Sequence, residues 1–164
     1  VLLHLVDVAP IDGSDPANAA CSVIQELERF SPALAARPRW LVLNKIDLID
    51  EDTLQARREE ILAALAWQGP VYEISAVAGT QTAPLCGDLM THLEHLMEQY
   101  QTDAVALEEE QAAQEQMQQE ARERIATLNR ARAEARHTAQ HGSQDQVLDA
   151  DEDADGEVDV EYRY

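Results

Sequence analysis

The tetrapeptide Asn44-Lys45-Ile46-Asp47 contains the residue types that a protein needs to recognise guanine. Guanine presents two donors side by side, the ring N1–H and the exocyclic amino group, and an ionised carboxylate such as Asp47 can accept both. The Asn44 amide can donate to the ring nitrogen on the opposite edge and accept from nearby backbone. The Lys45 stem can lie along the face of the base with its ammonium in water, while Ile46 is expected to point into the domain.

The tetrapeptide follows a short apolar run, residues 39 to 43, which predicts a β-strand. A helix is predicted after it, and ligands of open α/β sheets bind at the carboxyl ends of the strands. The alternative is a plain strand-to-helix turn in which Asn44 and Asp47 cap backbone groups. Four residues alone do not separate the two interpretations, so the context of the motif must decide between them.

A second turn, Ser75-Ala76-Val77, follows another predicted strand at residues 71 to 74. In guanine-nucleotide sites, a Ser-Ala pair at this place supplies a backbone N–H to the carbonyl oxygen of the base. The serine hydroxyl there holds the specificity aspartate. We therefore expect Ala76 to be the donor and Ser75 to orient Asp47. Because the two motifs occur in the expected order, together they predict a guanine site more strongly than either alone.

Four segments resemble the carboxyl-terminal half of the Obg family of bacterial ribosome-associated GTPases, and the resemblance covers about residues 1 to 97. It implies the fold of a P-loop GTPase, binding of GTP or GDP, slow GTP hydrolysis with Mg²⁺, and a role in biogenesis of the large ribosomal subunit and in stress control. Val77 departs from many small GTPases, which have a lysine there that covers the base. The segments are Leu2 to Asp7, Ile11 to Pro16, Pro38 to Asp47, and Ile74 to Ala76.

The sequence contains no phosphate-binding loop of the form G-x-x-x-x-G-K-[ST], because Lys45 is its only lysine. The segment Asp7-Val8-Ala9 is followed by Pro10, so a D-x-x-G switch is also absent there. We therefore expect a fragment that recognises the base but does not hydrolyse GTP. No catalytic or metal-binding residue is expected within it, and the phosphate loop, switches and Mg²⁺ ligands are expected upstream of Val1.

The elements that must position the two turns alternate between strand and helix, which predicts an α/β fold. Three parallel strands are expected, beginning with a buried strand at residues 1 to 8, and so few strands leave an unpaired sheet edge. Asp15 is a predicted helix N-cap before Pro16. The predicted helices are Ala17 to Phe30, Asp52 to Trp67, and Pro84 to Gln99.

Composition divides the chain into residues 1–99, the predicted half of an Obg-type G domain, residues 100–141, a charged helical extension, and residues 142–164, an acidic tail. Glu120 and Arg124 can pair along the extension at i, i+4. The extension is either an arm that docks on RNA or an acidic surface through its arginines, or a solvated single helix. Asp145 to Glu161 contains nine acidic residues and no basic ones, which predicts disorder.

The net charge of −20 opposes unassisted nucleic-acid binding. Cys21 and Cys86 lack C-x-x-C spacing, so we expect free thiols and a cytoplasmic protein. No apolar run is long enough for a membrane span, and a monomer is expected. The alternative function is a non-enzymatic α/β interaction module with a charged helical arm and an acidic tail.

Three further residue groups have simple structural interpretations. His4 is expected to be a core histidine with its hydrogen bonds satisfied. Asp7, at the end of a predicted strand, is expected to cap the turn toward Gly13. His92 and His95 lie within one helical turn of each other, and exposed positions on a helix explain them better than a metal site does.

Overall fold

The structure is a computed structural model that describes residues 1–148, with side chains described for residues 1–136. The chain divides into two units, Val1–Arg122 and Glu123–Tyr164, so the boundary lies within the last helix. The elements are β1 (Leu2–Asp7), α1 (Pro16–Phe30), α2 (Pro32–Ala35), β2 (Arg39–Asn44), the 3₁₀ turn η1 (Ile46–Leu48), α3 (Glu51–Ala64), β3 (Val71–Ile74), α4 (Thr82–Thr102) and α5 (Ala104–Leu148).

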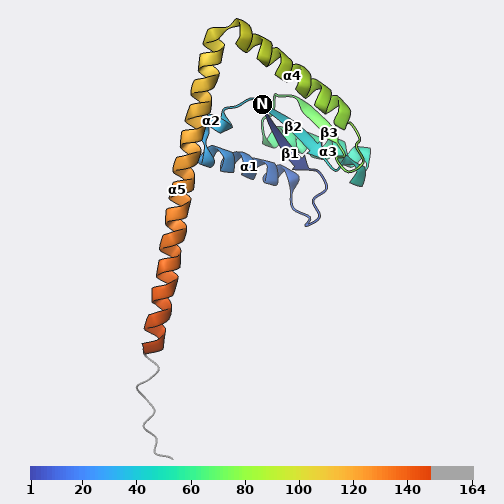
Figure 1. Cartoon of the computed structure of the whole chain (residues 1–164). Helices are drawn as coiled ribbons and strands as arrows, with labels where there is room; N and C mark the ends of the chain where they lie inside the picture. Colours follow the sequence, from blue (N-terminus) through green and yellow to red (C-terminus); the bar gives the residue numbers. More distant parts are fainter. Residues whose placement is uncertain (149–164) are drawn as a thin grey trace, which may run out of the picture. The chain divides into compact units, whose positions relative to one another are not determined.

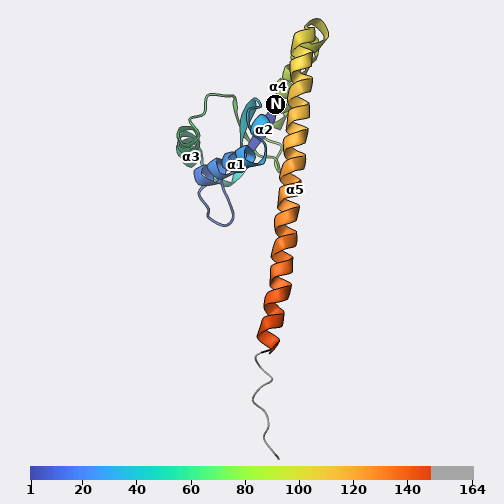
Figure 2. The ribbon, with the colours of Figure 1, turned by 90° about the vertical axis from the view of Figure 1, so that its left-hand side faces the viewer.

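The strands, which are labelled in Figure 1 and turned by 90° in Figure 2, form one parallel sheet in the order β1-β2-β3. Asp7 is aligned with Asn44, and Asn44 is aligned with Ile74, so the three strands end side by side. Each helix between strands returns the chain to the opposite end of the sheet, as parallel pairing requires. The predicted α/β class and the three parallel strands are therefore confirmed.

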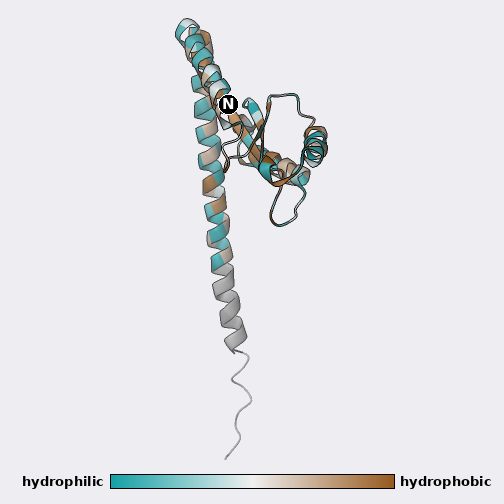
Figure 3. Cartoon of the chain, turned by 90° about the vertical axis from the view of Figure 1, so that its right-hand side faces the viewer, coloured by the Kyte–Doolittle hydropathy of each residue, from teal (hydrophilic) through white to brown (hydrophobic). Residues whose placement is uncertain are grey.

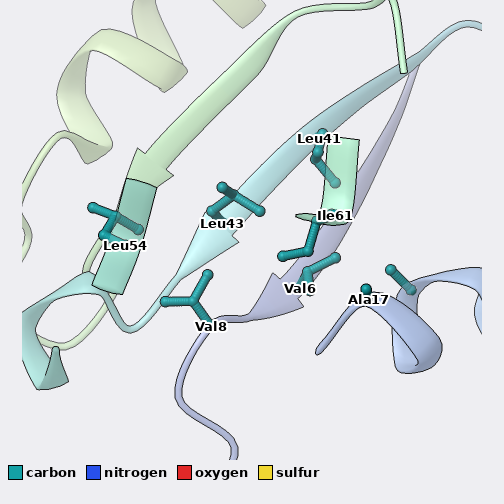
Figure 4. Packing of buried hydrophobic residues seen from close by; sticks show 8 residues of the cluster. Val6, Val8, Ala17, Leu41, Leu43, Leu54 and Ile61 are labelled. Atoms are coloured by element: carbon teal, nitrogen blue, oxygen red, sulfur yellow. The ribbon is translucent and has the colours of Figure 1, made fainter. Parts of the chain in front are cut away.

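Helices cover the sheet on both faces. On one face, α1 and α3 pack on β1 and β2, and Figure 4 shows Val6, Leu41, Leu43 and Ile61 pointing into the shared core. On the other face, α4 packs on β2 and β3 through a second cluster. That cluster consists of Trp40, Val42, Ile74 and Leu85. The central strand β2 is thus buried on both sides, as expected of a parallel strand between two helical layers.

Helix α1 begins as the sequence predicts. The Asp15 carboxylate accepts hydrogen bonds from the backbone N–H groups of Ala17 and Asn18, and Pro16 occupies the first turn. Both features favour a helix start, because the cap satisfies free donors and proline has no N–H to lose. The loop from Asp7 to Asp15 is therefore held at its far end by a well-capped helix.

The outer edge of β1 is the exposed side of the sheet. Leu3 is 37% exposed and Leu5 is 55% exposed, whereas Val42, the register partner of Leu5 in the central strand, is fully buried. The difference follows from coverage, because the cluster beneath α4 on this face is built on β2 and β3. In the described part of the chain, β1 also has a strand neighbour on one side only. The predicted unpaired edge is present in the structure.

Two polar contacts tie the first half of α5 to the segment around α2. The Arg37 guanidinium donates two hydrogen bonds to the Glu110 carboxylate, one of them 2.6 Å long from Nη2 to Oε1. Glu120 accepts from the Ser31 hydroxyl at 2.6 Å and from the Ala33 backbone N–H at 3.0 Å. The Glu120 carboxylate therefore has partners outside its own helix, and its pairing with Arg124 stays a prediction.

Helix α5 passes the predicted boundary at residue 141 and ends at Leu148, so the start of the predicted tail is helical. Residues 149–164, the rest of that tail, lie outside the described residues. Figure 3 shows hydrophilic and intermediate residues over most of the described part of α5, with hydrophobic ones at intervals. Within residues 1–148, no helix combines the length and apolar character needed to cross a membrane.

Candidate functional site

The candidate site lies at the carboxyl ends of the three strands. Asp7 is the last residue of β1, Asn44 is the last residue of β2, and Ser75 follows the last residue of β3. Because the strands are parallel and in register, their final side chains meet at one edge. The two predicted turns therefore lie next to each other, and Asn44 and Ala76, which are 32 residues apart along the chain, are in direct hydrogen-bond contact.

Asn44 joins the two predicted turns. Its side-chain oxygen Oδ1 accepts a hydrogen bond from the backbone N–H of Ala76 at 3.1 Å. Its side-chain nitrogen Nδ2 donates to Oδ1 of Asp7 at 3.2 Å. Acceptance from nearby backbone was predicted for Asn44, and the structure confirms it. The donor faces Asp7, whereas a ring nitrogen of a base was the predicted partner, so Asn44 here links three strand ends.

Lys45 adopts the left-handed backbone conformation, with φ of 70°. This conformation is unfavourable for a residue with a side chain, and such positions often mark functional turns. The Lys45 ammonium lies 2.7 Å from Oδ2 of Asp7, and its side chain is 29% exposed. Without a nucleotide, this ammonium is thus paired with a carboxylate, and the placement of the Lys45 stem along the face of a base stays a prediction.

Asp7 was not predicted to belong to the site, and its predicted role as a cap for the Gly13 turn is wrong. Asp12 performs that local role by accepting from the Ser14 backbone N–H at 3.0 Å. Asp7 instead contacts two consecutive residues of the neighbouring strand end, Asn44 and Lys45. The signal in the sequence was a carboxylate at a strand end, but its partners depend on strand register.

Asp47 and Ile46 lie in η1, immediately after Lys45, and point to different surroundings. Ile46 packs against the core cluster of β1, β2, α1 and α3, as predicted. Asp47 is exposed, and no hydrogen bond or ion pair engages its carboxylate among residues 1–136. Both oxygens of Asp47 are therefore available to a donor from outside the chain, as recognition of guanine requires.

The turn after β3 is fixed by its own hydrogen bonds. Ser75 is fully buried, and its hydroxyl oxygen accepts from the Ala78 backbone N–H at 3.1 Å. The predicted contact of Ser75 with Asp47 is absent from the described residues. The Ala76 N–H, predicted to donate to a base, donates to Asn44. Val77 is 96% exposed, and none of the backbone hydrogen bonds found in the described turns and loops comes from its N–H.

A cavity of about 710 Å³ opens beside Asp7 and Lys45. Its other walls are mostly apolar and come from β1, α1 and the loop between them, including Leu5, Ile11 and Val23. Asn44, Asp47, Ser75, Ala76 and Val77 do not line this cavity. This hollow therefore lies on the β1 side of the strand ends.

Two of the histidines each contact a tryptophan ring. His4 is buried, with its ring edge-on to Trp67, but its Nε2 atom has no hydrogen-bond partner among the described residues. Its predicted satisfaction is therefore wrong. Burial lowers the pKa of His4 and the nearby Arg39 charge adds to this effect, so the ring is neutral at pH 7. His92 contacts the Trp40 ring at a centroid distance of 5.3 Å.

Metal-binding residues do not gather anywhere in the described part of the chain, where no group of three or more His, Cys, Asp or Glu side chains could hold an ion. Cys21 and Cys86 are both free.

No model of a known protein family matches the chain. The chemical character of the site therefore has to be inferred from the two turns and from Asp7.

Proposed function

We propose that this chain recognises the guanine base of GTP or GDP through the turns that follow β2 and β3. The observation that carries the proposal is the hydrogen bond from the Ala76 N–H to Asn44 Oδ1, which joins residues 32 positions apart at 3.1 Å. It supports the view that the two motifs act as one site. It does not fit the alternative of two separate capping turns, because neither residue serves its own turn in this contact.

In this proposal, Asp47 accepts from the ring N1–H and the exocyclic amino group of guanine. The carboxylate is exposed and has no partner among the described side chains, which supports that role. The Val77 N–H is the donor for the base carbonyl, because the Ala76 N–H is already engaged by Asn44. Asn44 then acts mainly by holding the two turns together, and Ser75 acts by fixing the shape of the second turn through Ala78.

The resemblance to the Obg family extends the proposal to the complete protein of such a family. There we propose the fold of a P-loop GTPase, GTP hydrolysis with Mg²⁺, and work on the large ribosomal subunit in the cytoplasm. These properties depend on the resemblance of residues 1 to 97. For the 164-residue chain itself, the proposal is limited to the base.

A titration of the ¹⁵N-labelled chain with nucleoside monophosphates tests the proposal. GMP is expected to shift the backbone amide signals of Asp47 and Val77 in a saturable way. IMP lacks the exocyclic amino group, so about tenfold weaker binding is expected from the loss of one hydrogen bond to a charged acceptor. AMP offers no matching donor pair and is expected to leave these signals unchanged. Equal shifts with all three nucleotides, or none with GMP, would contradict the proposal.

A further inference from the structure

The Asp7 carboxylate uses each of its oxygens on a different residue of the first turn. Oδ1 accepts from Asn44 Nδ2 at 3.2 Å, and Oδ2 lies 2.7 Å from Lys45 Nζ. Strand register makes this possible, because Asp7 and Asn44 are aligned partners at the ends of β1 and β2. One side chain from outside both motifs therefore contacts two of the four residues of the first motif.

The contact with Asn44 decides which way that amide faces. A carboxylate can only accept hydrogen bonds, so the side of the amide toward Asp7 must be the NH₂ group. The carbonyl oxygen must then face the Ala76 N–H, which can only donate. Only one orientation of the Asn44 amide therefore satisfies both the carboxylate on one side and the backbone donor on the other. In this orientation the amide joins the two turns.

The contact with Lys45 keeps its ammonium away from Asp47. Lys45 adopts the left-handed conformation immediately before η1, and Asp47 lies two residues further along the chain. A lysine side chain that is not held by Asp7 has a long, flexible stem with which to turn toward a carboxylate so close in the sequence. Guanine needs both oxygens of Asp47, and an ammonium bound there would compete with the base. In the structure, Lys45 pairs with Asp7, and Asp47 is without a partner among the described side chains.

We propose that Asp7 is a positioning residue for guanine recognition, which holds Lys45 off Asp47 and fixes the orientation of the Asn44 amide. Asp7 does not itself touch the base in this account. The effect of Asp7 on the affinity for guanine rests on the proposed function. The structural premise of the proposal, the pairing of Lys45 with Asp7 and not with Asp47, can be tested without any nucleotide.

The nucleotide-free test uses the fact that Lys45 is the only lysine of the chain. Its acylation rate by an amine-reactive ester, followed by mass spectrometry of the Lys45 peptide, reports whether a carboxylate binds the ammonium. Asp7→Asn alone is expected to change the rate by less than about twofold, because Asp47 takes over the ammonium. Asp7→Asn combined with Asp47→Asn is expected to raise the rate about tenfold, as for loss of a charged hydrogen bond.

The nucleotide test measures GMP binding by Asp7→Asn, alone and combined with Lys45→Met. Asp7→Asn is expected to weaken GMP binding about tenfold, and Asp7→Asn combined with Lys45→Met is expected to recover most of this loss. Methionine keeps an apolar stem but removes the charge that competes for Asp47. A purely structural role of Asp7 would leave the double variant as weak as the single one. Asp12→Asn is the matched control, because Asp12 lines the same cavity but accepts from Ser14.

The two tests separate failure of this inference from failure of the proposed function. A full rise of the acylation rate in Asp7→Asn alone would overturn the inference, because Lys45 would then have no second carboxylate. GMP binding by Asp7→Asn combined with Lys45→Met that is as weak as binding by Asp7→Asn alone would overturn the inference as well. If the acylation rates are as expected but the unmodified chain does not bind GMP, Asp7 remains the partner of Lys45. Guanine recognition would then be contradicted. Circular dichroism spectra of each variant check that it is folded.

Discussion

The strand-end site and the first half of α5 both depend on carboxylates, but they use them in opposite ways. Asp47 is exposed, and its carboxylate contacts no donor among the described residues. Glu110 is only 16% exposed and is bound by two nitrogens of Arg37 and by the Gln114 side chain. A carboxylate with its partners inside the chain stabilises the fold, whereas one without them is available to a ligand.

Asp7 stands between these two cases. It is 42% exposed and has two partners within the chain, yet both partners belong to the proposed site. The comparison therefore separates three uses of a carboxylate: binding a ligand, positioning the residues around a ligand, and attaching a helix. Exposure alone does not distinguish these three uses, whereas the number and location of the hydrogen-bonding partners do.

The largest expected effect on stability is at the α5 attachment. Glu110→Gln leaves the Arg37 guanidinium without a charged partner, and we expect the free energy of unfolding to fall by about 2 kcal/mol. Urea denaturation followed by circular dichroism measures this change. Glu109→Gln, at an exposed neighbouring position, is the matched control and is expected to change stability by less than about 0.5 kcal/mol. Equal effects of the two substitutions would remove the distinction between attached and free carboxylates.

Acid should cancel that effect. Hydrogen bonds from Arg37 lower the pKa of Glu110 from its ordinary value of 4.5 to about 2. The folded pKa is depressed, so the contribution of Glu110 is complete above pH 4.5 and is lost as the pH falls toward 2. The difference in stability between the unmodified chain and Glu110→Gln, measured over this range, is expected to shrink on acidification. A difference independent of pH would contradict the ion pair.

A smaller effect is expected in the turn after β3. Ser75→Ala removes the acceptor of the Ala78 N–H in a fully buried position, and we expect a loss of about 1 kcal/mol in the free energy of unfolding. Ser22→Ala is the control, because the Ser22 hydroxyl donates back to Asn18 on an exposed helix surface. If Ser75→Ala left stability unchanged, the hydroxyl would not be what fixes the shape of this turn.

Local patterns predicted the elements well, and contacts between distant residues less so. Residues 71 to 74 have the strand bounds predicted for them, and Asp15 caps the helix as its residue type predicts. Periodicity and capping depend on neighbours in the sequence, which are visible there. The contact of Ser31 with Glu120 joins residues 89 positions apart, and no local pattern indicates it.

The same difference explains which parts of the site could be predicted. Asn44 and Ala76 belong to motifs whose residue types suggest their chemistry, and their turns do lie together. Asp7 was assigned to the wrong turn, because its real partners depend on the register of β1 against β2. Ser75 was assigned to Asp47, but the nearer Ala78 N–H engages its hydroxyl. Register and competition between donors require the folded structure.

If Asp47 recognises guanine, then Asp47→Asn should change which base the chain prefers. An amide presents a donor where the carboxylate presents only acceptors, so the substituted chain should prefer the carbonyl of xanthine to the amino group of guanine. Titration of both chains with GMP and XMP measures the two affinities, with Asp52→Asn as an exposed control. The preference between GMP and XMP is expected to reverse in Asp47→Asn and to stay unchanged in Asp52→Asn. Unchanged GMP affinity in Asp47→Asn would contradict guanine recognition by Asp47.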